Sequence, residues 1–446
     1  MKRLLLTNGT VVNEGRILEQ DLLIVGDRIE RIGAGALPAG TEVIDLAGCH
    51  VLPGIIDDQV HFREPGLTHK ADIASESRAA IAGGVTSYLD MPNNTPPCID
   101  RAGLAVKRAI AERSSFANFG FYLGATNGNI DEIRAATPAD ACGIKVFMGA
   151  STGDMLVDDE ETLERIFAEA RLPVATHCEY SPMIWEAEKR AREEYGDAVP
   201  MTMHPQIRSA EACYRSSSTA VALARRHGTR LHVLHLTTAR ELELFDTGPI
   251  GEKRITAEVC VHHLWFDESD YERLGARIKC NPAIKTRKDR DALRAAVASD
   301  RIDVIATDHA PHTLEEKGRD YFHAPAGLPL VQHSLAMLLE LRRQGHLSLE
   351  QIVEKASHNP ARLFGIVDRG YIREGAFADL AVVDLNAEQT VEAKGLFYKC
   401  GWSPLEGVTL GSRVVMTILG GQIVFRNGQV EDRPRGQALE FSEAGE

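Results

Sequence analysis

The chain has 446 residues, a formal charge of −14, 44% hydrophobic residues and 26% charged residues. This balance is typical of a globular protein with an ample core and room for a second, smaller domain. The acidic charge argues against nucleic-acid binding, and no apolar run reaches the roughly 20 residues of a membrane span. The eight scattered cysteines form no Cys-x-x-Cys pair, and the N-terminus lacks a signal-peptide pattern, so we expect reduced thiols and a cytoplasmic protein.

Both ends of the chain carry short strand patterns. Residues 4–7, 9–12, 21–25 and 28–32 are apolar runs separated by Asn-Gly and Gly-Asp turn signals. Residues 378–384 and 413–425 repeat this pattern near the other end. We therefore predict one small β-sandwich domain built from residues 1–53 and 367–446, with a polar, frayed tail after Gly428.

The middle of the chain alternates between strand and helix patterns, which is typical of a parallel α/β domain. Buried strands are predicted at residues 51–56, 85–91, 119–123, 143–148, 173–177, 230–235, 255–261 and 303–308. Helices with apolar residues at three- and four-residue spacing are predicted at residues 70–82, 101–113, 159–171, 209–227, 287–299 and 328–344. Eight such strands favour a (β/α)8 TIM-type barrel over residues 54–366.

Polar residues stand in or just after five of the predicted strands. They are His61 after the first strand, Lys145 within the fourth, His177 and His235 at the fifth and sixth, and Asp308 at the eighth. In a parallel barrel these positions converge on one mouth. Imidazoles and a carboxylate bind zinc or a similar divalent ion, and a buried lysine must be paired, neutral or modified. A purely structural role for all five is the weaker interpretation, whereas His232 is expected to pack in the core and His262 and His263 have an open role near the mouth.

These residues and their motifs resemble the amidohydrolase superfamily, and most closely the dihydroorotases, over residues 54–428. The signature Ala-Thr-Asp-His-Ala-Pro-His around Asp308 and the Gly-Ile-Lys-Val-Phe-Met strand around Lys145 carry most of the likeness. The resemblance implies one or two zinc ions bound by His61, Lys145, His177, His235 and Asp308, with Lys145 carbamylated. It also implies that Asp308 is the catalytic acid and base.

The same resemblance implies a small anionic substrate, dihydroorotate or N-carbamoyl-aspartate, interconverted in pyrimidine biosynthesis. Arg63 and Asn93 resemble the pair that binds the substrate carboxylate, and a guanidinium suits that role because it offers a bidentate fork. The remaining substrate contacts are expected from Asn281, His312 and the backbone of Ala324, Pro325 and Gly327. A homodimer is implied as well.

Two departures from the dihydroorotase pattern leave alternatives open. Gln59 stands where the family has the first histidine of a His-x-His pair, and the loop that begins at Ala326 lacks the glycine and glutamate usual in the later part of its motif. An allantoinase or hydantoinase shares the metal ligands, but such enzymes act on neutral rings and do not need Arg63. The Gln59 substitution also suits a non-catalytic dihydroorotase-like subunit.

Overall fold

Eight parallel strands form the barrel, in the order of the chain. The structure is a computed structural model that describes residues 2–149 and 155–442. The strands are β8 (Ile55–Val60), β9 (Val85–Asp90), β10 (Asn118–Gly124), β11 (Gly143–Phe147), β12 (Val174–His177), β13 (Leu231–Val233), β14 (Ile255–Cys260) and β15 (Val304–Ala306). A parallel bridge between Val60 and His309 joins the first strand to the end of the last and closes the barrel. The predicted barrel is confirmed.

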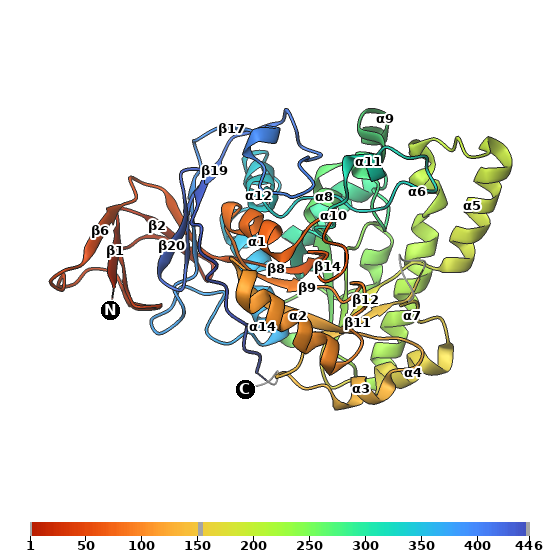
Figure 1. The fold of residues 1–446 in the computed structure, drawn as a ribbon, viewed down its shortest axis with the longest axis horizontal. Helices are drawn as coiled ribbons and strands as arrows, with labels where there is room; N and C mark the ends of the chain where they lie inside the picture. The colour runs from red at the N-terminus through yellow and green to blue at the C-terminus, as the bar shows by residue number, and fades with distance from the viewer. Residues whose placement is uncertain (1, 150–154, 443–446) are drawn as a thin grey trace.

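Amphipathic helices surround the strands (Figure 1). They include α1 (Ile73–Ala82), α2 (Arg101–Ser114), α4 (Glu160–Glu169), α7 (Ala210–His227), α10 (Arg287–Ala298) and α12 (Ser334–Arg343), with shorter helices α3 (Ile130–Ala135), α13 (Leu349–Val353) and α14 (Asn359–Phe364). Helix α1 begins later than predicted because Asp72 caps it, accepting a hydrogen bond from Ser75 N. Helices α5 (Ser181–Tyr195) and α6 (His204–Ile207) were not predicted, and Figure 1 shows α5 at the outer edge of the barrel.

Strands from both chain ends build the small domain, as predicted. One sheet has the order β5-β4-β1-β6 and the other the order β21-β20-β19-β16-β7-β2-β3. The N-terminal strands are β1 (Arg3–Thr7), β2 (Thr10–Asn13), β3 (Arg16–Glu19), β4 (Leu22–Val25), β5 (Arg28–Ile32), β6 (Glu42–Asp45) and β7 (His50–Pro53), and the C-terminal ones are β16 (Leu380–Asp384), β19 (Arg413–Leu419), β20 (Gln422–Arg426) and β21 (Gln429–Val430). Both sheets contribute to one apolar core, which includes Leu4, Ile24, Val382 and Ile418.

The predicted strand at 51–56 is divided between the two domains. Strand β7 pairs with β16 of the small domain, whereas β8 pairs with β9 of the barrel. The chain crosses at Gly54, where an added Cβ would lie 2.1 Å from Thr86 Oγ1. Only glycine allows this close approach. The domain limit after residue 53 stays a prediction.

The frayed tail is a wrong prediction for residues 429–442. Leu439 is 3% exposed, and its backbone N donates to Phe119 O near the start of β10, while Phe119 N donates to Gln437 O. Ser442 N donates to Gly365 O. Apolar anchors in an otherwise polar tail therefore hold it against the barrel.

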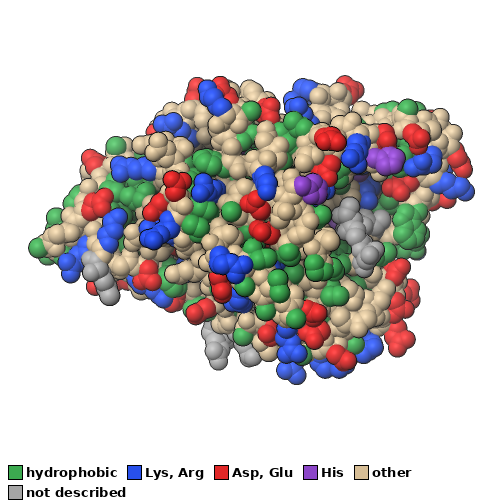
Figure 2. Space-filling view, in the orientation of Figure 1, with side chains coloured by type: hydrophobic (Ala, Val, Ile, Leu, Met, Phe, Trp, Pro, Cys, Tyr) green, Lys and Arg blue, Asp and Glu red, His purple; other side chains and the backbone are tan. Residues whose placement is uncertain are grey.

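Charged side chains of both signs cover the surface. On the face shown in Figure 2, Lys and Arg side chains are interspersed with Asp and Glu rather than gathered into one basic patch. Within residues 2–149 and 155–442, no helix is both long and apolar enough to cross a bilayer.

Candidate active site

The strand ends bring most of the predicted residues around one cavity. It is lined by Gln59, His61, Arg63, Asn93, Lys145, Phe147, His177, His235, Asn281, Asp308, Ala310, Ala326 and Gly327. His312 and Pro325 line a neighbouring pocket that shares Arg63 and Asn93 with the first. Ala324 lies at neither wall, and its carbonyl accepts a hydrogen bond from Lys279 Nζ at 2.6 Å.

Three residues that line this cavity have a strained backbone. Arg63, His235 and Asp308 have φ angles of 68°, 41° and 46°, in the left-handed region that residues with side chains seldom adopt. Each such residue costs roughly 1–3 kcal/mol, and strain of this kind persists where surrounding structure imposes it, often at functional sites. The strand ends are therefore shaped to aim these three side chains.

His61 and Asp308 form the first pair of facing donor atoms. His61 Nδ1 lies 2.7 Å from Asn93 Oδ1, an atom that only accepts, so the imidazole proton lies on Nδ1. The bare Nε2 then faces Asp308 Oδ1 at 2.9 Å. Two lone pairs opposed at this distance fit a bound cation.

His177 and His235 form the second pair. His177 Nδ1 lies 3.1 Å from His235 Nε2, while its Nε2 lies 3.1 Å from Glu179 Oε2. Although burial raises the pKa of Glu179, its ion pair with Arg208 and its contact with His177 lower it to about 2. The carboxylate is therefore ionised and orients the imidazole, as carboxylates behind metal-binding histidines do.

Lys145 lines the same cavity as the two pairs. The side chain is buried, and among the described residues no carboxylate lies within ion-pair distance of Nζ, which sits 4.6 Å from the centre of the Phe147 ring. Burial lowers the pKa of Lys145 to about 8. An amine of this kind is a candidate for modification, because a buried charge without a counterion is costly.

Arg63 is also a buried cation without a counterion. Its Nε donates to Pro311 O at 3.1 Å, and among the residues described here none supplies a carboxylate within 4 Å. Its NH2 group lies 3.0 Å from His312 Nε2. Lys70 Nζ lies 3.0 Å from His312 Nδ1, and Ala326 O lies 3.0 Å from Nε2, so Nδ1 accepts and Nε2 donates. The end of the guanidinium is therefore left free to bind a ligand.

Asn281 supplies an unused acceptor. Its Oδ1 is buried and has no hydrogen-bond partner among the described residues. Buried polar atoms are seldom left unpaired, and an exception inside a cavity points to a ligand with an N–H group. Nearby, Lys317 Nζ donates to the carbonyl oxygens of Pro325 and Gly327, both at 2.9 Å, and holds this loop against the site.

Gln59 does not face the site as a ligand would. Its Nε2 donates to Asp308 Oδ1 at 3.2 Å, and its Oε1 lies 3.7 Å from Cys260 Sγ. The amide oxygen therefore turns toward Cys260.

Two further buried groups have donor atoms within 4.8 Å of one another: Asp58 with His232 and Glu258, and Cys260 with His262 and His263. The sequence named the three histidines but did not predict that they form these groups. Both are candidate positions for a divalent ion. In the first group, His232 Nε2 lies 3.2 Å from Asp58 Oδ2 and 3.6 Å from Glu258 Oε2. Although burial lowers it, these carboxylates raise the pKa of His232 to about 9, so an imidazolium also balances the group. The spacing of the strands, rather than any motif, brings these residues together.

Known proteins resemble this chain over most of its length. A model described as the amidohydrolase family matches residues 50–424. An allantoinase from Solibacter usitatus is 35% identical over 98% of this chain and 97% of its own. A dihydroorotase from Methanothermobacter thermautotrophicus is 35% identical over 90% of each chain. Among solved structures, L-hydantoinase (dihydropyrimidinase) from Arthrobacter aurescens aligns with a TM-score of 0.93 and 27% identity over 99% of this chain and 100% of that one.

Proposed function

The chain belongs to the amidohydrolase family, and within it we propose that the protein is a dihydroorotase. The reaction is the reversible hydrolysis of L-dihydroorotate to N-carbamoyl-L-aspartate, a step of pyrimidine biosynthesis. Relatives at equal identity carry the names allantoinase and dihydroorotase, so overall likeness does not choose between them. The choice rests on the cavity.

The observation that carries the proposal is the buried guanidinium of Arg63, which has no carboxylate counterion among the described residues. A buried cation without a counterion is unfavourable until an anion arrives, and the carboxylate of dihydroorotate is such an anion. Asn281 Oδ1, the unpaired acceptor on the same cavity, suits a ring N–H of the substrate. A neutral hydantoin or allantoin ring would leave the guanidinium unmatched.

Divalent ions fit the two pairs of facing donor atoms. We propose that His177 and His235 would hold one ion, that His61 and Asp308 would hold the other, and that Lys145, once carbamylated, would supply further oxygen ligands. Nitrogen and carboxylate donors of this kind suit zinc. When bound, the metal supplies Lewis-acid chemistry, polarising the amide carbonyl and lowering the pKa of water.

Asp308 is the proposed proton carrier. Its Oδ1 lies 2.9 Å from His61 Nε2 and accepts a hydrogen bond from Gln59 Nε2, and 8% exposure leaves the carboxylate open to the cavity. It accepts a proton from the attacking water and returns it to the ring nitrogen as the amide bond breaks. Arg63 and Asn281 meanwhile hold the ring in place.

A substrate panel tests the proposal. Purified protein is assayed on L-dihydroorotate, allantoin, hydantoin and dihydrouracil, with metal content measured on the same sample. We expect hydrolysis of dihydroorotate with the highest kcat/KM and a homodimer by light scattering. Preferred hydrolysis of allantoin or hydantoin would establish the alternative enzyme, and a metal-loaded protein inactive on all four rings would point to a non-catalytic subunit.

A further inference from the structure

A segment of the C-terminal region lies against the loop that carries Asp308 and His312. In this segment, residues 398–402, Trp402 Nε1 donates to His312 O at 2.7 Å, and Lys399 N donates to Glu76 Oε1 at 3.0 Å. The Trp402 side chain is fully buried. The His312 end of the 308–312 loop is thus in contact with Trp402, and the same segment also contacts Glu76 on helix α1.

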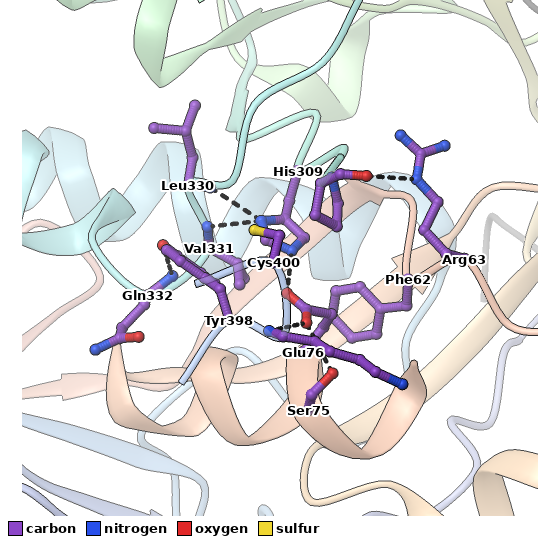
Figure 3. Close-up of polar contacts among 12 residues, drawn as sticks. Phe62, Arg63, Ser75, Glu76, His309, Leu330, Val331, Gln332, Tyr398 and Cys400 are labelled. Atoms are coloured by element: carbon purple, nitrogen blue, oxygen red, sulfur yellow. Dashed lines mark hydrogen bonds and ion pairs between the residues drawn. The ribbon is translucent and has the colours of Figure 1, made fainter. Parts of the chain in front are cut away.

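Glu76, on helix α1, holds the imidazole of His309 (Figure 3). His309 Nδ1 accepts backbone hydrogen bonds from Leu330 N at 2.9 Å and Val331 N at 3.2 Å, so the ring proton lies on Nε2. That proton is donated to Glu76 Oε2 at 2.7 Å. Both side chains are fully buried, and the orientation of the ring is therefore fixed on both sides.

His309 links this pair directly to the proposed site. It follows Asp308, whose backbone is in the left-handed region, and its carbonyl accepts a hydrogen bond from His61 N at 2.8 Å. A shift of the His309 ring would move the backbone on both sides of the His61 and Asp308 pair. Glu76 touches neither residue and acts through His309.

Trp402 holds the other end of the loop. Its indole N–H fixes the carbonyl of His312, whose ring lies between Lys70 and Arg63. Without that bond, the carbonyl would remain buried with an unmet acceptor, and the ring beside the guanidinium would lose its support.

We propose that Glu76 and Trp402 are positioning residues that hold the two ends of the 308–312 loop. Glu76 sets Asp308 for proton transfer, and Trp402 sets His312 beside the anion-binding guanidinium. The assignment of these two effects rests on the proposed function. The C-terminal segment therefore completes a site whose other residues come from the barrel.

The first variant is Glu76→Gln. Glu76 accepts hydrogen bonds from His309 on one oxygen and from Lys399 N and Ser75 Oγ on the other. Glutamine has one oxygen and one NH2 group, so it must direct N–H against either His309 Nε2–H or Lys399 N–H. Displacing groups that orient reactive residues typically costs about 10- to 100-fold. We expect such a loss in kcat with KM near that of the unmodified protein.

The second variant is Trp402→Phe, which keeps the ring in the core and removes only its N–H. We expect KM for the anionic ring to rise about 10-fold, with kcat at saturation little changed. Lys399→Met is the matched control: it removes the ion pair between Lys399 and Asp72 but keeps the backbone N–H that Glu76 accepts. Its kinetics should equal those of the unmodified protein.

The proposal would be overturned if both variants had the kcat and KM of the unmodified protein. It would also be overturned if kcat fell and KM rose by the same factor in each variant, in step with a fall in melting temperature. Should Glu76→Gln not fold, Trp402→Phe decides, because an unchanged KM in that folded variant refutes a positioning role. The proposed function is tested separately, because it fails if the unmodified protein does not hydrolyse dihydroorotate. In that case, kcat and KM of the two variants are measured on the ring that the protein does hydrolyse. Crystal structures of the variants add a readout that needs no turnover: Asp308 or His312 should shift, and unchanged positions would refute the proposal.

Discussion

Replacing Arg63 by Met should raise stability and lower activity, and the structure gives both magnitudes. Burial lowers the pKa of Arg63 from 12.5 to about 10, which means that folding disfavours the charged guanidinium. At about 1.4 kcal/mol per pH unit, this cost is roughly 3 kcal/mol, and it is fully present at any pH below the folded pKa. Methionine avoids the cost but loses the hydrogen bond to Pro311 O, worth about 1 kcal/mol. The net expectation is a gain in unfolding free energy of about 2 kcal/mol at pH 7.

Activity should change in the opposite direction. Removing one partner of a buried charge pair costs about 2–5 kcal/mol, which corresponds to a loss of roughly 30- to 5,000-fold in kcat/KM for dihydroorotate. Dihydrouracil lacks the carboxylate and should lose far less. Arg63 would then stabilise the bound substrate while it destabilises the free protein, as expected where activity and stability place opposite demands on a residue.

The assay combines urea unfolding with kinetics on dihydroorotate and dihydrouracil, and Arg63→Lys is the control. Lysine keeps the charge but not the bidentate fork. The kcat/KM of Arg63→Lys should therefore lie between those of the unmodified protein and Arg63→Met. Equal losses on the charged and neutral rings would show that Arg63 holds its loop through Pro311 rather than the substrate carboxylate. A stability loss greater than about 1 kcal/mol in Arg63→Met would refute the energetic argument.

Two further predictions concern the proposed chemistry. Asp308→Asn should keep the fold and lower kcat by about 100- to 10,000-fold because an amide cannot shuttle the proton, and near-normal turnover would end that role. Lys145→Ala should lose metal and activity, and a short carboxylic acid in the buffer should restore part of both by replacing the carbamate oxygens. Full metal content in the alanine variant, measured by atomic absorption, would make Lys145 a structural lysine.

The sequence predicted the barrel because short strand patterns alternate with helix patterns along the middle of the chain. Every residue of β9 and β10 is buried, including the polar Thr86, Ser87 and Asp90 of β9, whose burial the sequence pattern did not indicate. Helix α5 was missed although Ser181 and Pro182 give it a standard start, since only a few of its residues are buried. The tail was missed because Leu439 gains its contacts from Phe119, which is far away in the sequence.

The sequence predicted which residues gather at the strand ends, but not the contacts that orient their side chains. Parallel strands end at one mouth, and that topology alone gathers His61, Lys145, His177, His235 and Asp308. The partners that orient these groups come from other elements. Glu179 behind His177, Lys70 beside His312 and Glu76 behind His309 are recognised only once the fold brings them together.

Gln59 shows how one such contact changes the expected metal site. Its N–H and His61 both point at Asp308 Oδ1, so a metal ion bound there competes with an amide for the carboxylate. The His177 and His235 pair has no such competitor, and we expect about one tightly bound ion per chain there with a looser one at His61 and Asp308. Cys260 Sγ lies 3.7 Å from Gln59 Oε1 and 3.4 Å from Glu258 Oε1, so the thiol contacts the amide oxygen in this orientation. Gln59→His should therefore raise occupancy of the looser position, and Cys260→Ala should raise it less, by freeing the amide to present oxygen. Two equally tight ions in the unmodified protein, measured by competition with a chelator, would show that the amide does not weaken the site.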